Sequence, residues 1–155
     1  MRRKDRELHT KDELLAILEE AEVCRLAIQT GGAPYIVPLN FGYSWADQLV
    51  LYFHSAGEGR KIDLLKENNT VGFELDTAHV LAKAVKACDW GMKYRSVIGT
   101  GMVEFIEDED EKRLALQAIM RKYGFPGEAS FDGAMLRSTK VYKLVAQEVS
   151  GKEKK

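Results

Sequence analysis

The chain has 155 residues, of which 45% are hydrophobic and 30% charged, and its formal net charge is −1. This length suits one globular domain, residues 1–155, and the near-neutral charge argues against a nucleic-acid binder, which needs a basic surface. No apolar run reaches the roughly 20 residues that cross a bilayer, so we expect a cytoplasmic protein without membrane contact.

The two ends and the cysteines carry little sign of chemistry. Four of the first six residues are basic, and the last five are mostly lysine. We interpret such charge runs as solvated and expect residues 1–9 and 151–155 to be flexible tails. Cys24 and Cys88 form neither a CxxC pair nor a disulfide framework, and the three histidines show no metal-ligand spacing, so we expect no metal site.

The first predicted elements are a helix and a hairpin. Residues 10–13 (Thr-Lys-Asp-Glu) have the capping-box pattern, and apolar residues at helical spacing follow, which predicts a helix ending near Glu22. Residues 23–29 and 35–39 are β-rich and flank two glycines, a hairpin signal. Pro38 within the second strand favours a sheet edge or a bulge, since proline donates no ladder hydrogen bond.

The middle of the chain alternates strands and breaks. Residues 42–48 are turn-like, 49–54 predict a third strand, 60–68 a short helix and 71–75 a fourth strand. Residues 76–92 stay undecided, because their middle favours helix by propensity and strand by alternation.

The last third predicts a long strand, a helix and a final strand. Residues 94–106 are strand-rich, and Gly99 and Gly101 suit a bend where a sheet curls. Asp108 opens a strongly periodic helix to Tyr123, and residues 141–149 form the last strand. Regular βαβ alternation is absent, so a mainly β, mostly antiparallel barrel with peripheral helices is favoured.

The densest candidate site follows the third strand. Ser55, Gly59, Arg60 and Lys61 place a hydroxyl, a permissive glycine and two adjacent cations at the start of the predicted helix. Phosphate binding uses these groups, because helix N-terminal amides and fixed positive charge both favour an anion. A glycine-rich turn followed by exposed cations is the alternative interpretation.

Two further clusters suit a flat ring or a packed loop. Pro38, Asn40 and Phe41 bring an amide and an aromatic ring to a strand end, which suits a planar ligand with polar edges. The other interpretation is an ordinary strand end with a capping asparagine. Trp90 and Arg95-Ser96 mix an aromatic ring, a cation and a hydroxyl before a long strand, or form only a packed loop.

Taken together, in their order along the chain, the three clusters resemble the FMN-binding split-barrel family around pyridoxamine 5′-phosphate oxidase. The closer likeness is to its nitroimidazole-resistance (Nim-like) branch. It is carried by residues 21–27, 34–43, 51–61 and 86–99 and extends from about residue 2 to 119. The resemblance implies a six-stranded antiparallel split β-barrel that forms a homodimer with two flavin sites at the interface.

The resemblance also assigns roles to residues. Arg60 and Lys61 correspond to the pair that holds the cofactor phosphate, and the turn with Asn40 corresponds to a segment near the isoalloxazine ring. The region of Trp90, Arg95 and Ser96 is expected to line the cofactor or the interface, from the same chain or from the partner subunit. FMN is the expected cofactor, with FAD, deazaflavin and haem as alternatives.

His54 matches a histidine that the Nim-like branch associates with its active site. An imidazole with a pKa near 6.5 can donate a proton or a hydrogen bond to a nitro group or a carbonyl. The leading hypothesis is a flavin-dependent reductase that takes electrons from NADH or NADPH and reduces a small acceptor such as a nitroaromatic compound. The alternative is a flavin- or haem-binding module that stores or senses its ligand without turnover. Pyridoxamine-phosphate oxidase activity is disfavoured, because the substrate-phosphate residues of that branch are not found in the C-terminal third.

Overall fold

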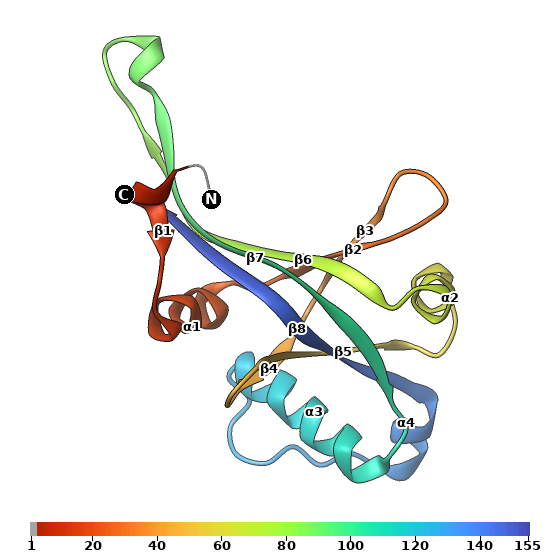
Figure 1. The fold of residues 1–155 in the computed structure, drawn as a ribbon. Coiled ribbons are helices and arrows are strands. Elements are labelled where there is room, and N and C mark those ends of the chain that lie inside the picture. Colours follow the sequence, from red (N-terminus) through yellow and green to blue (C-terminus); the bar gives the residue numbers. More distant parts are fainter. Residues whose placement is uncertain (1–2) are drawn as a thin grey trace.

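The computed structural model describes residues 3–155 as a mainly β domain with helices around a curled sheet (Figure 1). Its strands are β1 Glu7–Leu8, β2 Cys24–Ile28, β3 Tyr35–Leu39, β4 Gly42–Trp45, β5 Leu49–Ala56, β6 Thr70–Ala82, β7 Gly91–Ile106 and β8 Thr139–Lys154. Its helices are α1 Lys11–Glu20, α2 Arg60–Glu67, α3 Glu109–Lys122 and α4 Gly133–Ser138, with 3-10 turns at Lys4–Arg6 and Ala87–Asp89.

The strands form one antiparallel sheet in the order β3-β2-β6-β7-β8-β5-β4, and β1 pairs with β8. The two edge strands of this order, β3 and β4, are consecutive in the chain and are joined by only two residues, Asn40 and Phe41. Edges joined so closely require the sheet to curl back on itself, as a split barrel does. The predicted fold class is therefore confirmed, with β1 and β4 as strands beyond the expected six.

Several predicted elements are confirmed, with small shifts. Thr10 caps α1 through a complete capping box with Glu13, although the helix ends at Glu20 rather than Glu22. The hairpin β2–β3 forms, and β3, which contains Pro38, is an edge strand. The register of β7 against β8 shifts between Thr100 and Gly101, within the segment where a bend was expected.

The undecided segment 76–92 is an extension of the β6–β7 hairpin. Strand β6 continues to Ala82, with an irregularity between Thr77 and Val80 where Ala78 has a φ of 56°. Figure 1 shows this hairpin projecting from the sheet as an arm. Exposed apolar side chains on the arm include Val85 and Trp90.

Two sequence predictions are wrong, and one helix was missed. Residues 42–48 were expected to form a turn, but Gly42–Trp45 is strand β4, paired with β5. Residues 151–154 are not a tail, because they continue β8 and pair with β1 and β7. Helix α4 was not anticipated, and its six residues are too few to show a periodic pattern.

The predicted N-terminal tail is also partly structured. Glu7 and Leu8 pair with the end of β8, a contact that joins the two termini and that no local sequence pattern announces. Residues 1–2 of that predicted tail, including Arg2, lie outside the described residues.

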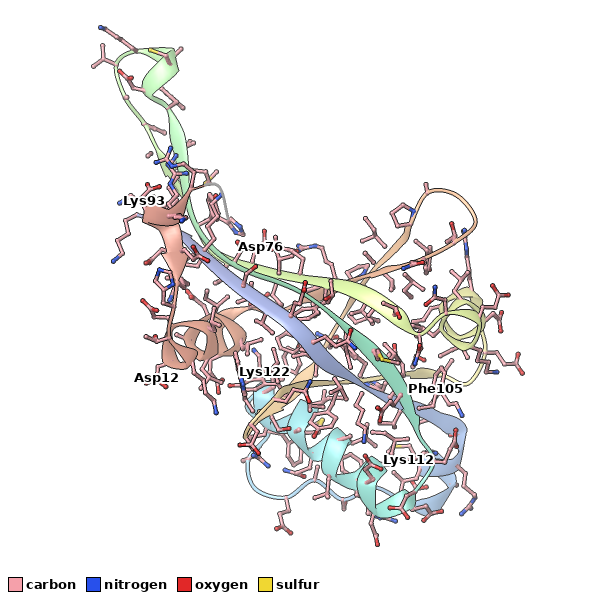
Figure 2. The ribbon with its side chains drawn as sticks, viewed as in Figure 1. Asp12, Asp76, Lys93, Phe105, Lys112 and Lys122 are labelled. Atoms are coloured by element: carbon pink, nitrogen blue, oxygen red, sulfur yellow. The ribbon has the colours of Figure 1, made fainter. Side chains whose placement is uncertain are left out.

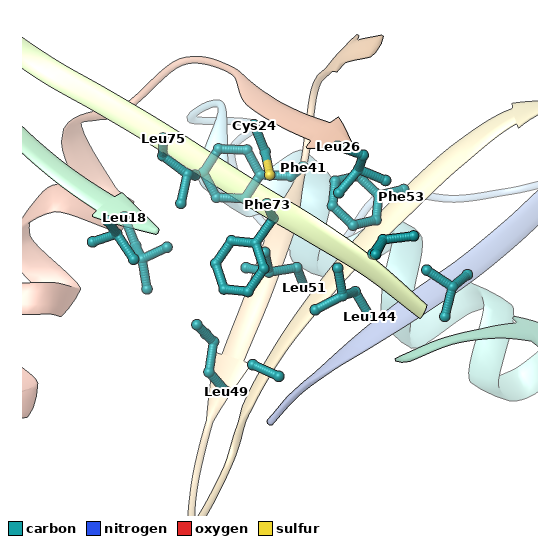
Figure 3. Close-up of a cluster of buried hydrophobic side chains, with 14 of the residues drawn as sticks. Leu18, Cys24, Leu26, Phe41, Leu49, Leu51, Phe53, Phe73, Leu75 and Leu144 are labelled. Atoms are coloured by element: carbon teal, nitrogen blue, oxygen red, sulfur yellow. The ribbon is translucent and has the colours of Figure 1, made fainter. Parts of the chain in front are cut away.

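The core fills the inside of the curled sheet (Figure 3). It is built from alternate residues of the strands together with one face of α1 and of α2. Phe41, Phe53 and Phe73 are its labelled rings, each at most 2% exposed. A second cluster of buried residues lies beneath α3 and α4.

Gly42 is required by the close approach of β4 to α3. A Cβ added at Gly42 would lie 2.4 Å from the backbone nitrogen of Ile119 in α3. We therefore expect Gly42→Ala to reduce the free energy of unfolding by about 1–3 kcal/mol in denaturant titrations, since the helix or the strand must move. Gly32→Ala is the matched control, because nothing lies within 4 Å of its added Cβ. Equal stability of the two variants would contradict the packing described here.

Candidate functional site

The junction of β5 with α2 positions the phosphate-site residues that the sequence predicted. Strand β5 carries His54 and Ser55 at its end, and α2 begins at Arg60. Gly59 precedes the helix with a φ of 128°, a conformation that side-chain-bearing residues rarely adopt, and no side chain of residues 3–155 caps the helix. Its carbonyl accepts the N–H groups of Ile62 and Asp63. A helix N-terminus without a side-chain cap favours negative charge.

Arg60 and Lys61 add two positive charges to this helix end. Among residues 3–155, neither forms an ion pair with a carboxylate. The Arg60 guanidinium carbon lies 4.8 Å from the centroid of the Tyr35 ring, at the start of β3. Lys61 is half-buried, and desolvation lowers the pKa of its ammonium group. Two adjacent cations without a carboxylate partner are suited to a multiply charged anion.

His54 lies close enough to Lys61 for the two side chains to interact electrostatically. Desolvation and, after it, the positive charge of Lys61 lower the pKa of His54 below its ordinary value of 6.5. Both effects favour the neutral form of the imidazole. A neutral imidazole donates one hydrogen bond and accepts another, so His54 is suited to hydrogen bonding with a ligand.

Ser55 faces the barrel interior near a residue that sequence reasoning missed. Its hydroxyl donates to the carbonyl of Ala56 at 2.9 Å. Tyr142 of β8 is fully buried and stacks on Phe53 with ring centroids 5.6 Å apart, yet its hydroxyl has no hydrogen-bond partner among residues 3–155. Burial raises the pKa of this phenol. Its place in the predicted last strand indicated burial, but no sequence signal indicated an unpaired hydroxyl.

The second predicted cluster lies at the split between the sheet edges. Pro38 is exposed on the edge strand β3, opposite Arg25 of β2, and Asn40 is exposed in the connection to β4. The Phe41 ring is fully buried in the core, and the backbone N–H of Phe41 donates to the hydroxyl of Tyr123 at 3.2 Å. The expected stacking of the Phe41 ring on a ligand is therefore replaced by core packing, since this connection turns its apolar side chain inward.

The third predicted cluster lies at the other end of the sheet. Trp90, on the arm, donates from its indole N–H to the carbonyl of Ala84 at 2.7 Å. Arg95 forms an ion pair with Glu20 of α1. Ser96 pairs across the sheet with Asp76 at the base of the arm.

The pairing of β5 and β7 with the shared strand β8 shows how far the third cluster lies from the β5–α2 junction. His54 is level with Val141 of β8, and Ser96 is level with Lys152 of the same strand. The eleven positions between them, at about 3.3 Å each, make a path of roughly 36 Å along β8. Figure 2 shows the length of the neighbouring strand β7, with Lys93 and Phe105 labelled toward its two ends. One chain therefore does not bring the third cluster to Arg60 and Lys61.

Tyr35 is a further site residue that sequence reasoning did not assign. It belongs to the segment that carries the family resemblance, but its ring contacts a residue 25 positions away. Only the folded hairpin and helix bring the two together, so no local pattern could have revealed the contact.

Among residues 3–155, no helix has the length and apolar character needed to span a bilayer.

Comparison with known proteins gives one family and several structural relatives. Residues 10–153 match the pyridoxamine 5′-phosphate oxidase family. A candidate 5-nitroimidazole antibiotic resistance protein from Bacteroides thetaiotaomicron is 37% identical, with a TM-score of 0.82 over 95% of this chain and 86% of that one. No curated protein matches the chain.

Two other solved structures share the fold. The flavocytochrome Anf3 from Azotobacter vinelandii has a TM-score of 0.83 at 23% identity, over 100% of this chain and 72% of its own. A FAD-binding protein from Mesorhizobium loti has a TM-score of 0.65 at 25% identity, over 97% and 98% of the two chains.

The influence of Lys61 on His54 can be measured directly. An NMR titration of the histidine ring signals is expected to give His54 a midpoint below 6.5, and Lys61→Ala is expected to raise it. Lys66→Ala removes an exposed lysine from the same helix and is expected to leave the midpoint unchanged. A His54 midpoint that does not respond to Lys61→Ala would show that the two groups are not coupled.

Proposed function

Because the chain belongs to the pyridoxamine 5′-phosphate oxidase family, we propose that it binds a flavin whose phosphate lies at the β5–α2 junction. The observation that carries this proposal is the pair Arg60 and Lys61, unpaired with carboxylates among residues 3–155, at a helix start without a side-chain cap. Arginine can form two parallel hydrogen bonds to a phosphate, while lysine acts as a point charge. The groups present therefore fit a terminal phosphate.

FMN is the proposed cofactor among the flavins. The monoester phosphate of FMN concentrates up to about two negative charges on one phosphorus atom, whereas the diphosphate of FAD spreads its charge over two, so the FMN phosphate better matches two adjacent cations. The relatives named as a flavocytochrome and as a FAD-binding protein make haem and FAD the competing outcomes of a binding experiment.

We propose that two copies of the chain form a homodimer that completes each site. The region of Trp90, Arg95 and Ser96 is expected to line the cofactor or the interface, yet it lies far along the sheet from Arg60 in its own chain. A second copy supplies these residues without any rearrangement of the sheet. The exposed apolar side chains of the arm, Val85 and Trp90 among them, give such a partner a surface to cover.

The proposed activity is reduction of a small acceptor, such as a nitroaromatic compound, with electrons from NADH or NADPH. The bound flavin supplies the redox chemistry. The chain holds the phosphate through Arg60 and Lys61, and His54 offers a hydrogen bond to a polar group of the acceptor. The 37% identity to a candidate 5-nitroimidazole resistance protein supports this choice of acceptor.

A binding module without turnover is the second candidate. One relative is named only for binding FAD, which is the observation that favours it. Oxidation of NADH or NADPH in the presence of an acceptor separates the two functions, because a storage or sensing module would bind flavin without sustained turnover.

The phosphate assignment predicts a defined loss of affinity. The double variant Arg60→Ala/Lys61→Ala is expected to bind FMN at least tenfold more weakly in a fluorescence titration, because both phosphate-facing charges are removed. Lys66→Ala, an exposed charge later in α2, is the control and is expected to bind FMN normally. Unchanged affinity in the double variant would refute the phosphate site.

The role of His54 predicts a change in rate rather than in binding. His54→Ala is expected to retain the flavin and to reduce a nitroaromatic acceptor about tenfold or more slowly, since a positioned hydrogen bond to the acceptor is lost. Steady-state oxidation of NADH or NADPH measures this rate, and His9→Ala is the control. Wild-type turnover in His54→Ala would make the histidine a structural residue.

A further inference from the structure

The Tyr35 ring and the Arg60 side chain form a contact that no predicted role uses. The guanidinium carbon lies 4.8 Å from the ring centroid, within the roughly 6 Å range of a cation–π interaction. Arg60 is exposed, and across residues 3–155 its side chain makes no ion pair or hydrogen bond. An exposed arginine without such contacts would ordinarily sample many rotamers. Here the aromatic ring restricts it.

The ring is itself fixed in place. Tyr35 is half-buried, packs against the core and pairs with Ile28, which is fully buried. The other end of α2 is tied to the same hairpin, because the amide of Asn68 donates to the side chain of Gln29 at 3.0 Å. The hairpin β2–β3 and helix α2 therefore hold the ring and the guanidinium in a set relation.

Such a platform affects how an arginine recognises phosphate. A guanidinium held by its face keeps its N–H groups at the edge, where two of them can meet two phosphate oxygens. Because the side chain is ordered before the ligand arrives, less conformational entropy is lost on binding. Lys61 is not among the cations that lie over aromatic rings in residues 3–155, so the two adjacent cations differ in this respect.

We propose that Tyr35 is a positioning residue that presents Arg60 to the phosphate and thereby sets the preference of the site for phosphorylated over unphosphorylated flavin. This inference rests on the proposed flavin function. Tyr35 acts through Arg60, so its contribution exists only for ligands that carry the phosphate. The phenol hydroxyl is not needed for this role, because the ring face makes the contact.

Titrations with FMN and with riboflavin, which lacks the phosphate, test the proposal. Tyr35→Leu is expected to bind FMN about three- to fivefold more weakly and riboflavin as the wild type does, which also shows that the barrel is intact. Tyr35→Phe is expected to bind both normally, since it keeps the ring. In an Arg60→Ala background, Tyr35→Leu is expected to cause no further loss. Trp45→Leu removes a different ring, which lies under Lys11, and is the control.

Each contrary outcome has a distinct meaning. An equal loss of FMN and riboflavin affinity in Tyr35→Leu, or a further loss in the Arg60→Ala background, would overturn the positioning role. So would a loss in Tyr35→Phe as large as that in Tyr35→Leu. If Tyr35→Leu does not fold, Tyr35→Met takes its place with the same expected split. A wild-type protein that binds neither flavin would overturn the proposed function and this inference with it.

Discussion

The two-residue connection between β3 and β4 is the constraint on which the rest of the structure depends. It joins the two edges of the sheet order, so the sheet cannot lie open. Phe41 in this connection is fully buried and, with Phe53 and Phe73, fills the space that the curl encloses. Gly42, the next residue, lets α3 approach the closed side to within contact of the strand backbone. The curl of the sheet, the burial of Phe41 in the core and the close packing of α3 thus all involve this short segment.

The fold places two positively charged side chains together at the start of α2. Strand β5 ends beside the start of α2, and Gly59 turns the chain so that Arg60 and Lys61 follow at once. Desolvation lowers the pKa of Lys61, and desolvation together with the charge of Lys61 lowers the pKa of His54. Each lowered pKa means that the positively charged form of the side chain is disfavoured in the free protein. A bound anion would stabilise these charged forms and raise both pKa values. The electrostatics of the free protein and the proposed ligand therefore agree.

Local patterns predicted the elements whose causes are local. The capping box at Thr10 and the proline of an edge strand are examples, because a few neighbouring atoms decide each. The junction of β5 with α2, where Arg60 and Lys61 begin the helix, was predictable for the same reason. The pairing of β1 with the end of β8, the inward turn of Phe41 and the contact of Tyr35 with Arg60 depend on residues distant in sequence. The long β6–β7 arm was ambiguous because its alanine and lysine residues suit helix, and only sheet pairing decides for strand.

The proposed function depends on flavin binding through Arg60 and Lys61 at the β5–α2 junction of the split barrel. The visible absorption spectrum of the purified protein, recorded after addition of FMN and passage through a sizing column, tests it most directly. We expect flavin bands that elute with a dimer. A protein that retains no chromophore in the presence of excess FMN, or one that shows a Soret band instead, would contradict it.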